Sequence, residues 1–420
     1  MPKKIGHNHN LNVYDMHIQG QDIIMVGIQA WDRPMGGNAR DLALEFSKNN
    51  RVLYVNPPIN RKSQLKPGKT DRMKRKLSVL RNQRLPLQQI HKQLWVLTPK
   101  TIIESVNWLP SGALFNYFNA LNAERWAKAI VRQAGQLGFR DFLLFNDSSM
   151  FMGVHLKALL RPKVYLYYIR DNLVTNPYWR KHGKVFEPKV IAEADVVVTN
   201  AKRYADYARQ YNPNAYFVGQ GCDLSRFEGD TRQLEEAEAT KQLPNPVIGY
   251  AGQLTTRRLD ERILCRIARA KPEWTLFLLG PQESSFRHSA LHDLPNVHLP
   301  GPCPPEVLPR YLKGFDVCLN PQLVNSATKG NYPRKIDEYL AMGKPVVATH
   351  TPAMAYFEEY TYLADTPESY EPLIQRAMEE DTPEKQNARR AFALSHTWAA
   401  NTQAIAQAIY DSLSLTPSAN

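Results

Sequence analysis

The sequence has few cysteines, no long apolar run and, in its first half, few acidic residues. Its four cysteines stand singly among 420 residues, in none of the paired spacings typical of zinc sites or disulfide frameworks. No segment approaches the ~18 consecutive apolar residues that a membrane-spanning helix needs. The residues that follow Met1 lack the apolar core of a signal peptide. These absences predict a cytoplasmic, reduced protein without a structural disulfide or zinc site.

The shortage of acidic residues is confined to one half of the chain. Residues 1–225 carry 33 Lys and Arg against 16 Asp and Glu, whereas residues 226–420 carry 20 against 24. Eleven of the basic residues fall between residues 61 and 92, where Asp71 is the single acid. This asymmetry predicts a polyanionic partner for the first half. Nucleic acid, an anionic membrane and phosphorylated substrates all remain open on charge alone.

The basic segment is followed by an aromatic one. Met73, Leu77 and Leu80 recur at helical spacing among the basic residues, and Trp108 and the run 114–118 come after them. Basic charge beside aromatic residues favours peripheral contact with an anionic membrane, at its inner face. A solvated loop beside a buried aromatic helix is the alternative. Nucleic acid is not expected, because no motif places stacking aromatics in a basic frame.

Short apolar runs alternate with helical segments in both halves. The runs at 23–28 and 51–55 begin the first half, and the runs at 247–252 and 275–279 begin the second. Such alternation predicts parallel sheets covered by helices on both faces. The polar segment 228–246 reads as a linker between them. We therefore expect an α/β protein with two doubly wound Rossmann-like domains that face a cleft, divided into residues 1–227 and 228–395.

Two strand exits carry residues suited to phosphate. Gly36, Gly37 and Asn38 stand between the first strand and its helix, where glycine admits a ligand close to the backbone. A plain tight turn is the alternative. Arg257 and Arg258 follow the first strand of the second half, where two guanidinium groups are suited to a diphosphate. Solvated charges at a helix start are the alternative.

The strongest pattern lies in residues 330–348. Lys335 and Glu338 stand one turn apart on one helix, which Gly343 and Pro345 end before a buried strand. The loop 325–331 is rich in Asn, Ser and Thr and is suited to cradle phosphate through its amides. Glu338 is suited to a ribose diol and Lys335 to a phosphate. A surface Lys–Glu pair is the alternative.

The pattern Pro333-x-Lys335-x-x-Glu338-Tyr339-Leu340-Ala341-x-Gly343-x-Pro345-Val346-Val347 resembles the donor-nucleotide signature of GT-B glycosyltransferases. It is most similar to the group that resembles the retaining family 4 enzymes. The segments 247–252 and 274–281 agree with this likeness. Residues 395–398 resemble the entry to a terminal helix, over about 396–420, that packs back on the first domain. The likeness covers most of the chain and is strong over 247–350.

The resemblance implies a transferase that moves a sugar from a nucleotide-sugar donor to a membrane-proximal or lipid-linked glycan. Within the donor site Glu338 would bind the ribose, and Arg257, Arg258 and Lys335 would neutralise the departing diphosphate. These cations make a metal and any other cofactor unnecessary, and retention is favoured over inversion. The remaining implied donor residues are Gly252 and Asn331.

Two positions leave other functions open. Members of the group often have an acid eight residues before the glutamate, where this sequence has Gly330. That departure supports a non-catalytic GT-B-fold binding protein at a membrane, and a nucleotide-sugar epimerase is a further alternative. Asp171, at a strand end in the first half, is a candidate for binding an acceptor hydroxyl, or for general base if the enzyme inverts. Capping of the next turn by Asp171 is the other interpretation.

Overall fold

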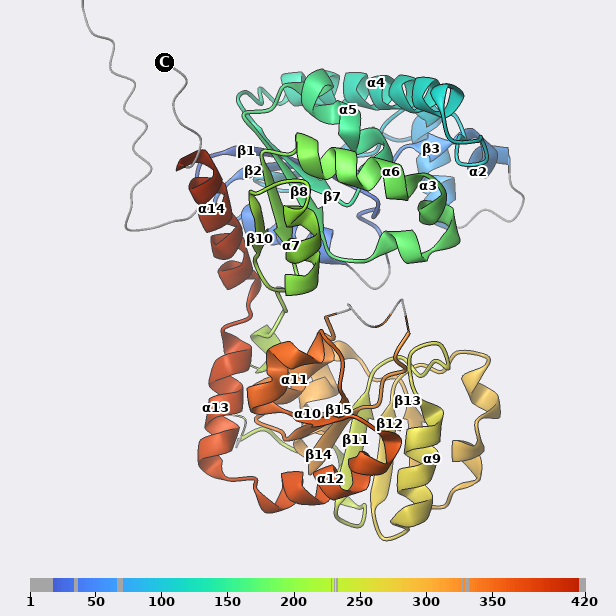
Figure 1. The fold of residues 1–420 in the computed structure, drawn as a ribbon, viewed down its shortest axis with the longest axis vertical. Coiled ribbons are helices and arrows are strands. Elements are labelled where there is room, and N and C mark those ends of the chain that lie inside the picture. The colour runs from blue at the N-terminus through green and yellow to red at the C-terminus, as the bar shows by residue number, and fades with distance from the viewer. Residues whose placement is uncertain are drawn as a thin grey trace, which may run out of the picture. The chain divides into compact units, whose positions relative to one another are not determined.

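The structure is a computed structural model that describes residues 18–414 except 34–36, 66–70, 228, 230, 232, 326–327 and 329–331. It forms two compact units (Figure 1): the first ends at Gly219 and resumes at Trp398, and the second spans Gln220–Thr397. The second unit begins before residue 228 because Cys222, Leu224 and Phe227 pack in its core. Among the described residues, no helix combines the length and apolar character that crossing a bilayer requires.

The first unit contains an eight-stranded sheet in the order β10-β9-β8-β7-β1-β2-β5-β4. All neighbours pair in parallel except β4 with β5. The strands are β1 Asp22–Gly27, β2 Arg51–Val55, β4 Leu87–His91, β5 Leu94–Leu97, β7 Leu143–Asp147, β8 Val164–Ile169, β9 Val196–Thr199 and β10 Ala215–Phe217, and β3 Ile59–Asn60 pairs separately with β6 Ile102–Ile103. The helices are α1 Asn38–Phe46, α2 Arg61–Leu65, α3 Asp71–Leu80, α4 Ala113–Gln136, α5 Met150–Leu160, α6 Pro177–Glu193, α7 Lys202–Arg209 and α14 Trp398–Ser414.

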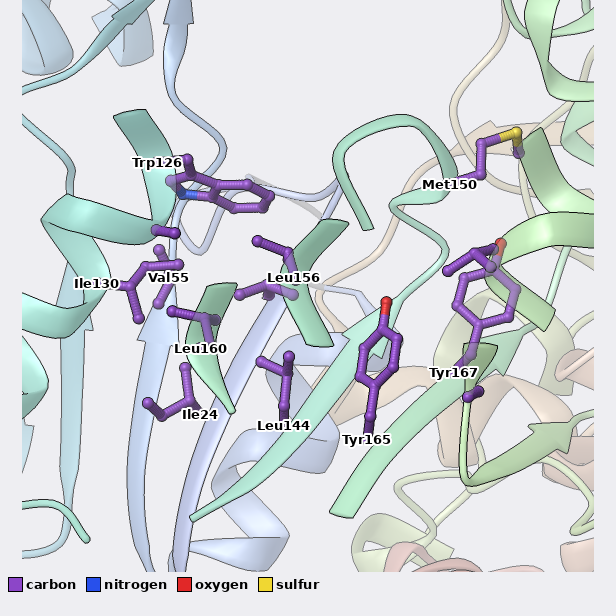
Figure 2. Close-up of a cluster of buried hydrophobic side chains, with 14 of the residues drawn as sticks. Ile24, Val55, Trp126, Ile130, Leu144, Met150, Leu156, Leu160, Tyr165 and Tyr167 are labelled. Atoms are coloured by element: carbon purple, nitrogen blue, oxygen red, sulfur yellow. The ribbon is translucent and has the colours of Figure 1, made fainter. Parts of the chain in front are cut away.

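Both faces of this sheet are buried. Successive residues of a strand point to opposite sides, so neighbouring residues of one strand belong to different hydrophobic clusters. Ile24 of β1 packs with Trp126 of α4 and Leu156 of α5 on one face, as Figure 2 shows. Its neighbour Ile23 belongs to the cluster on the other face, which includes residues of α1 and Ile405 of α14. The terminal helix α14 therefore completes the core of the first unit.

The second unit contains a parallel six-stranded sheet in the order β13-β12-β11-β14-β15-β16. Its strands are β11 Val247–Ala251, β12 Thr275–Leu279, β13 Val297–Gly301, β14 Val317–Asn320, β15 Val346–Thr349 and β16 Tyr362–Ala364. Its helices are α8 Glu238–Lys241, α9 Glu261–Ala270, α10 Leu308–Lys313, α11 Lys335–Ala341, α12 Tyr370–Glu379 and α13 Pro383–Leu394. The chain reverses its direction across the sheet between β11 and β14, and ligands of doubly wound sheets bind beyond the carboxyl ends of the strands at such a point.

Glu187 of α6 carries a buried carboxyl group, and its contribution to the stability of the folded protein depends on pH. Burial raises its pKa from 4.5 to about 7, and its only hydrogen bond among the described residues comes from the Tyr207 hydroxyl at 3.4 Å. Because the folded state binds the proton more tightly than the unfolded state, the stability that this group contributes is full below pH 4.5 and is lost as the pH rises through 7.

We therefore expect Glu187→Gln to raise the free energy of unfolding at pH 8 by up to about 3 kcal/mol relative to the wild type. At pH 4.5 the two proteins should unfold at similar denaturant concentrations. Urea titrations at both values of pH measure the difference. A difference that is the same at both would contradict the prediction.

Candidate active site

The carboxyl edge of the second sheet is built around two glycines. Gly252 follows β11 and Gly280 follows β12, and both have φ of +148°. A Cβ atom on Gly280 would lie 1.9 Å from the carbonyl oxygen of Gly252, and one on Gly252 would lie 2.6 Å from Nζ of Lys335. The backbone here thus lies directly against a lysine ammonium group. No larger residue fits at either position without displacing its neighbours.

Lys335 is held at this edge by an aromatic ring. It is the first residue of α11, and its Nζ lies 3.8 Å from the centroid of the Tyr250 ring on β11. The Tyr250 hydroxyl donates a hydrogen bond to the Gln253 carbonyl oxygen at 3.1 Å, which fixes the ring. A cation in the first turn of a helix is opposed by the helix dipole. The contact with the ring offsets that cost and directs the ammonium group to the end of β11.

Glu338 lies one turn after Lys335 and presents a carboxylate without a hydrogen bond from any residue that the structure describes. Its side chain is half-buried. Burial raises the pKa of this group, while the positive charges of Arg334 and Lys335 act in the opposite direction. A carboxylate has enough acceptor sites for both hydroxyls of a vicinal diol.

Arg257 and Arg258 lie on the loop after β11, and both side chains are exposed. Backbone hydrogen bonds join this loop to the segment after β14: Leu323 donates to the Arg258 carbonyl oxygen and Asp260 donates to Pro321, each at 2.8 Å. An Arg257 guanidinium nitrogen lies 3.8 Å from a carboxylate oxygen of Glu283. The two arginines and Lys335 therefore belong to the same edge of the sheet.

Two of the residues predicted from the sequence, Gly36 and Asn331, lie outside the described residues, as does Gly330. The described part of the loop before α11 is ordered by its own side chains. The backbone nitrogen of Asn325 donates to the Thr328 hydroxyl at 2.9 Å, and the backbone nitrogen of Thr328 donates to the Asn325 Oδ1 at 3.1 Å. This reciprocal pair joins Asn325 to Thr328, and the Asn325 side chain also donates to the Arg257 carbonyl oxygen.

A buried polar cluster beneath α11 was not predicted from the sequence. Asp337 is fully buried, and its Oδ1 accepts hydrogen bonds from His396 Nδ1 at 2.8 Å and from the Tyr332 hydroxyl at 3.1 Å. Burial raises the pKa of this carboxyl group. The backbone nitrogen of Cys222 donates to the His396 carbonyl oxygen at 2.9 Å. The cluster thus fastens the helix of Lys335 and Glu338 to both ends of the second unit.

One signal for this cluster was present in the sequence. Helical spacing places residue 337 on the same face as Leu340 and Ala341, which are apolar and buried. An acid on an apolar helix face requires a buried partner. The partner, His396, is 59 residues away and could not be identified from spacing.

Asp171 and the predicted glycine turn lie in the first unit. Arg170, just after β8, forms a buried ion pair with Asp147 at the end of β7, with 2.7 Å between Nε and Oδ1. The same guanidinium group lies 3.1 Å from Oδ2 of Asp171, whose side chain is 42% exposed. Arg170 thus links a buried acid to one that solvent can reach. A Cβ atom on Gly27, the last residue of β1, would lie 2.8 Å from Cβ of Asp147, so glycine permits this packing.

Gly37 and Asn38 begin α1 close to this charge cluster. With its amide oxygen turned towards the guanidinium groups, Gln29 accepts hydrogen bonds from Arg170 at 2.8 and 3.1 Å and from Arg33 at 2.8 Å. A Cβ atom on Gly37 would overlap the Gln29 amide. Gly37 and Asp171 therefore belong to one polar cluster at the carboxyl edge of the first sheet, whereas Lys335 and Glu338 belong to the second unit.

Comparison with solved structures identifies the class of fold. The chain superposes on Anabaena Alr3699/HepE in complex with UDP with a TM-score of 0.62 and 15% identity, over 93% of this chain and 100% of that one. It is equally similar to sucrose-phosphate synthase from Thermosynechococcus elongatus, with a TM-score of 0.62, 15% identity and coverage of 94% and 100%. The predicted GT-B fold, with two Rossmann-like domains, is confirmed.

Sequence comparison adds a similarity within the second unit. Residues 245–379 match the family Glycosyl transferases group 1. The chain is 25% identical over 240 residues to the putative teichuronic acid biosynthesis glycosyltransferase TuaH of Bacillus subtilis (strain 168). That alignment covers 54% of this chain and 60% of the relative. Gly252, Lys335 and Glu338, which the sequence predicts to bind the donor nucleotide, lie inside the matched range, and this range falls within the second unit.

Proposed function

We propose that the chain is a glycosyltransferase that moves a sugar from a nucleoside diphosphate sugar, bound by the second unit, to an acceptor bound by the first. The observation that carries the proposal is the pairing of Glu338, with its open carboxylate, and Lys335 at the Gly252 turn. The carboxylate is suited to the two ribose hydroxyls. The ammonium group is suited to the diphosphate on which negative charge grows as the sugar departs.

The donor nucleotide that we favour is UDP. Alr3699/HepE is solved with UDP and also with UDP-glucose, the latter with a TM-score of 0.55 to this chain. Lys335, Arg257 and Arg258 supply fixed positive charge at the strand ends, so the proposed reaction uses no metal or other cofactor. Retention is favoured over inversion. Asp171, held by Arg170, is proposed to bind the acceptor hydroxyl.

The acceptor that we propose is a lipid-linked or membrane-proximal glycan at the inner face of an anionic membrane. The name of the relative TuaH places that protein in teichuronic acid biosynthesis, which supports a polysaccharide product. The basic excess of the first unit suits an acidic lipid surface or an acceptor that carries phosphate.

A panel of UDP-, GDP-, ADP-, dTDP- and CMP-sugars tests the donor. A ligand present at 100 times its dissociation constant stabilises the folded state by about 2.7 kcal/mol, which thermal unfolding detects readily. UDP-sugars are expected to give the largest shift. The product then separates the alternatives, since an epimerase releases a free nucleotide sugar and a transferase forms a glycosidic bond. Binding without turnover of any donor would favour the non-catalytic binding protein.

Glu338→Gln tests the nucleotide site directly. The substitution keeps the shape of the side chain but removes the charge that strengthens its hydrogen bonds to hydroxyl groups. We expect the dissociation constant for UDP, measured by calorimetry, to rise about 10- to 100-fold. Glu359→Gln, which changes an exposed carboxylate in the same unit, should leave UDP binding unchanged. Equal affinity of Glu338→Gln and wild type for UDP would refute the ribose contact.

A further inference from the structure

The first unit exposes large apolar side chains around the starts of α4 and α6. Trp108 and Tyr117 are 71% and 65% exposed, and Leu114 and Tyr178 are 51% and 52% exposed. Isolated exposed apolar residues are ordinary, but two tryptophan- and tyrosine-bearing segments beside each other are not. We call these four residues, with Arg180, Lys181 and Lys184, the aromatic–basic surface.

Direct contacts hold the two segments together. The side-chain nitrogen of Asn107 donates to the Tyr178 carbonyl oxygen at 2.9 Å, and Lys181 Nζ donates to the Trp108 carbonyl oxygen at 2.8 Å. Beneath them the rings of Phe115 and His182 stack with their centroids 3.7 Å apart. The aromatic–basic surface is therefore anchored in the core, and its exposed rings project from a backbone that these contacts hold in place.

The charge around these rings has one sign. Arg180, Lys181 and Lys184 are exposed on α6. Residues 105–123 and 172–186 contain no Asp or Glu. Arg180 and Lys181 lie within one turn of Tyr178, and Lys181 is also bonded to the Trp108 loop. The surface thus combines apolar rings with cations and without acids, the combination that membrane interfaces select.

The aromatic–basic surface uses the aromatic part of the sequence that was predicted to contact a membrane. The basic segment 61–92 predicted an amphipathic helix with Met73, Leu77 and Leu80 on its apolar face. In the structure α3 buries Leu77 and leaves Met73 and Leu80 partly exposed, so part of this apolar face packs within the protein. Arg75 of α3 also pairs with Asp32 at 2.8 Å.

We propose that the aromatic–basic surface docks the protein on an anionic lipid bilayer. The rings of Trp108, Tyr117 and Tyr178 would enter the interfacial region, where tryptophan and tyrosine are favoured. The cations of α6 would lie among acidic headgroups. The elements that carry the surface, α4 and α6, cover the same face of the first sheet (Figure 1), so one approach to the bilayer brings all of these side chains into contact. This inference rests on the proposed function, because it names the surface that would bring the protein to a membrane-proximal acceptor.

Flotation with lipid vesicles tests the inference without any sugar transfer. The full chain should bind vesicles of phosphatidylcholine and phosphatidylglycerol and should bind phosphatidylcholine vesicles weakly. The double variant Trp108→Ser/Tyr117→Ser should lower the partition coefficient on the acidic vesicles about tenfold or more, because burial of two large side chains is lost. Lys184→Glu should weaken binding to acidic vesicles only. Val131→Ser, which alters an exposed apolar residue near the C-terminal end of α4, should bind as the wild type does.

The outcomes separate this inference from the proposed function. Wild-type levels of vesicle binding by the double variant, at unchanged thermal stability, would overturn the docking surface. So would a dimer, seen by light scattering, that the double variant abolishes, because the surface would then contact a second copy of the chain. UDP binding should be the same in all of these proteins, and its absence from the wild type would contradict the transferase proposal alone.

Discussion

Lys335→Ala is expected to lower kcat/KM for the nucleotide-sugar donor by about 10²- to 10³-fold. The wild-type ammonium group is held before the donor arrives, over the Tyr250 ring at 3.8 Å and against Gly252. A fixed cation stabilises charge that develops on the leaving diphosphate without reorganising at the moment of reaction. Alanine is a good helix former, so the substitution keeps the helix while it removes the ammonium group and its contact with the Tyr250 ring. Steady-state turnover of the donor that most stabilises the protein measures the effect.

Lys271→Ala is the matched control for this substitution. Lys271 also lies over an aromatic ring, with its Nζ 5.3 Å from the centroid of Trp274. That pair precedes β12 and so lies at the opposite, amino edge of the same sheet. Its loss should leave turnover within about twofold of the wild type, as for surface substitutions away from a site. Equal turnover by Lys335→Ala and Lys271→Ala would remove Lys335 from the proposed mechanism.

Gly280→Ala is expected to lower the free energy of unfolding by about 2 to 6 kcal/mol. A φ of +148° costs a residue with a side chain about 1 to 3 kcal/mol. The overlap of the new Cβ with the Gly252 carbonyl oxygen, at 1.9 Å, adds a comparable cost because backbone must move to relieve it. The displaced Gly252 turn also adjoins Lys335. Denaturant titration measures the stability, and UDP calorimetry measures the site.

Gly301→Ala separates the cost of the positive φ from the cost of the Cβ overlap. Gly301 ends β13 in the same sheet and has φ of +90°, but nothing lies within 4 Å of the Cβ that alanine would add. It should therefore show only the conformational cost, about 1 to 3 kcal/mol, and bind UDP as the wild type does. Similar losses of stability in the two variants would show that crowding at Gly280 is relieved by small shifts.

The architecture was accessible from the sequence because its signals are local. The apolar runs at 51–55 and 275–279 coincide with β2 and β12, and the alternation of strands and helices led to the fold that comparison confirms. The terminal helix was expected over about 396–420. In the structure α14 spans Trp398–Ser414, after Ser395 caps the end of α13.

The candidate site was accessible only where its residues are close in sequence. The spacing of Lys335 and Glu338 predicted one helix, and α11 carries both. Their roles in donor binding stay predictions. The Asp337–His396 pair joins residues 59 apart, and the Asp147–Arg170 pair joins the end of β7 to the residue that follows β8. Contacts of that kind depend on how strands and helices pack, which periodicity does not report.

The membrane hypothesis also depended on packing that the sequence does not show. Composition identified basic charge and aromatic residues, but it could not tell which side chains the core would take. Leu109 and Phe115 are buried, whereas Trp108 and Tyr117, close to them in sequence, are exposed. The packing of α4 against α5 and α6 decides that Phe115 is buried.

The second unit is a single uninterrupted stretch of chain, Gln220–Thr397, set within the sequence of the first. Its two ends are joined, since Cys222 pairs with Thr397 as an isolated parallel bridge. In genetic terms this unit is one continuous coding segment whose ends are adjacent in the folded protein. One exchange of that DNA segment would replace all the residues of this unit that are proposed to bind the donor, while the first unit, proposed to bind the acceptor, kept its own sequence, including α14.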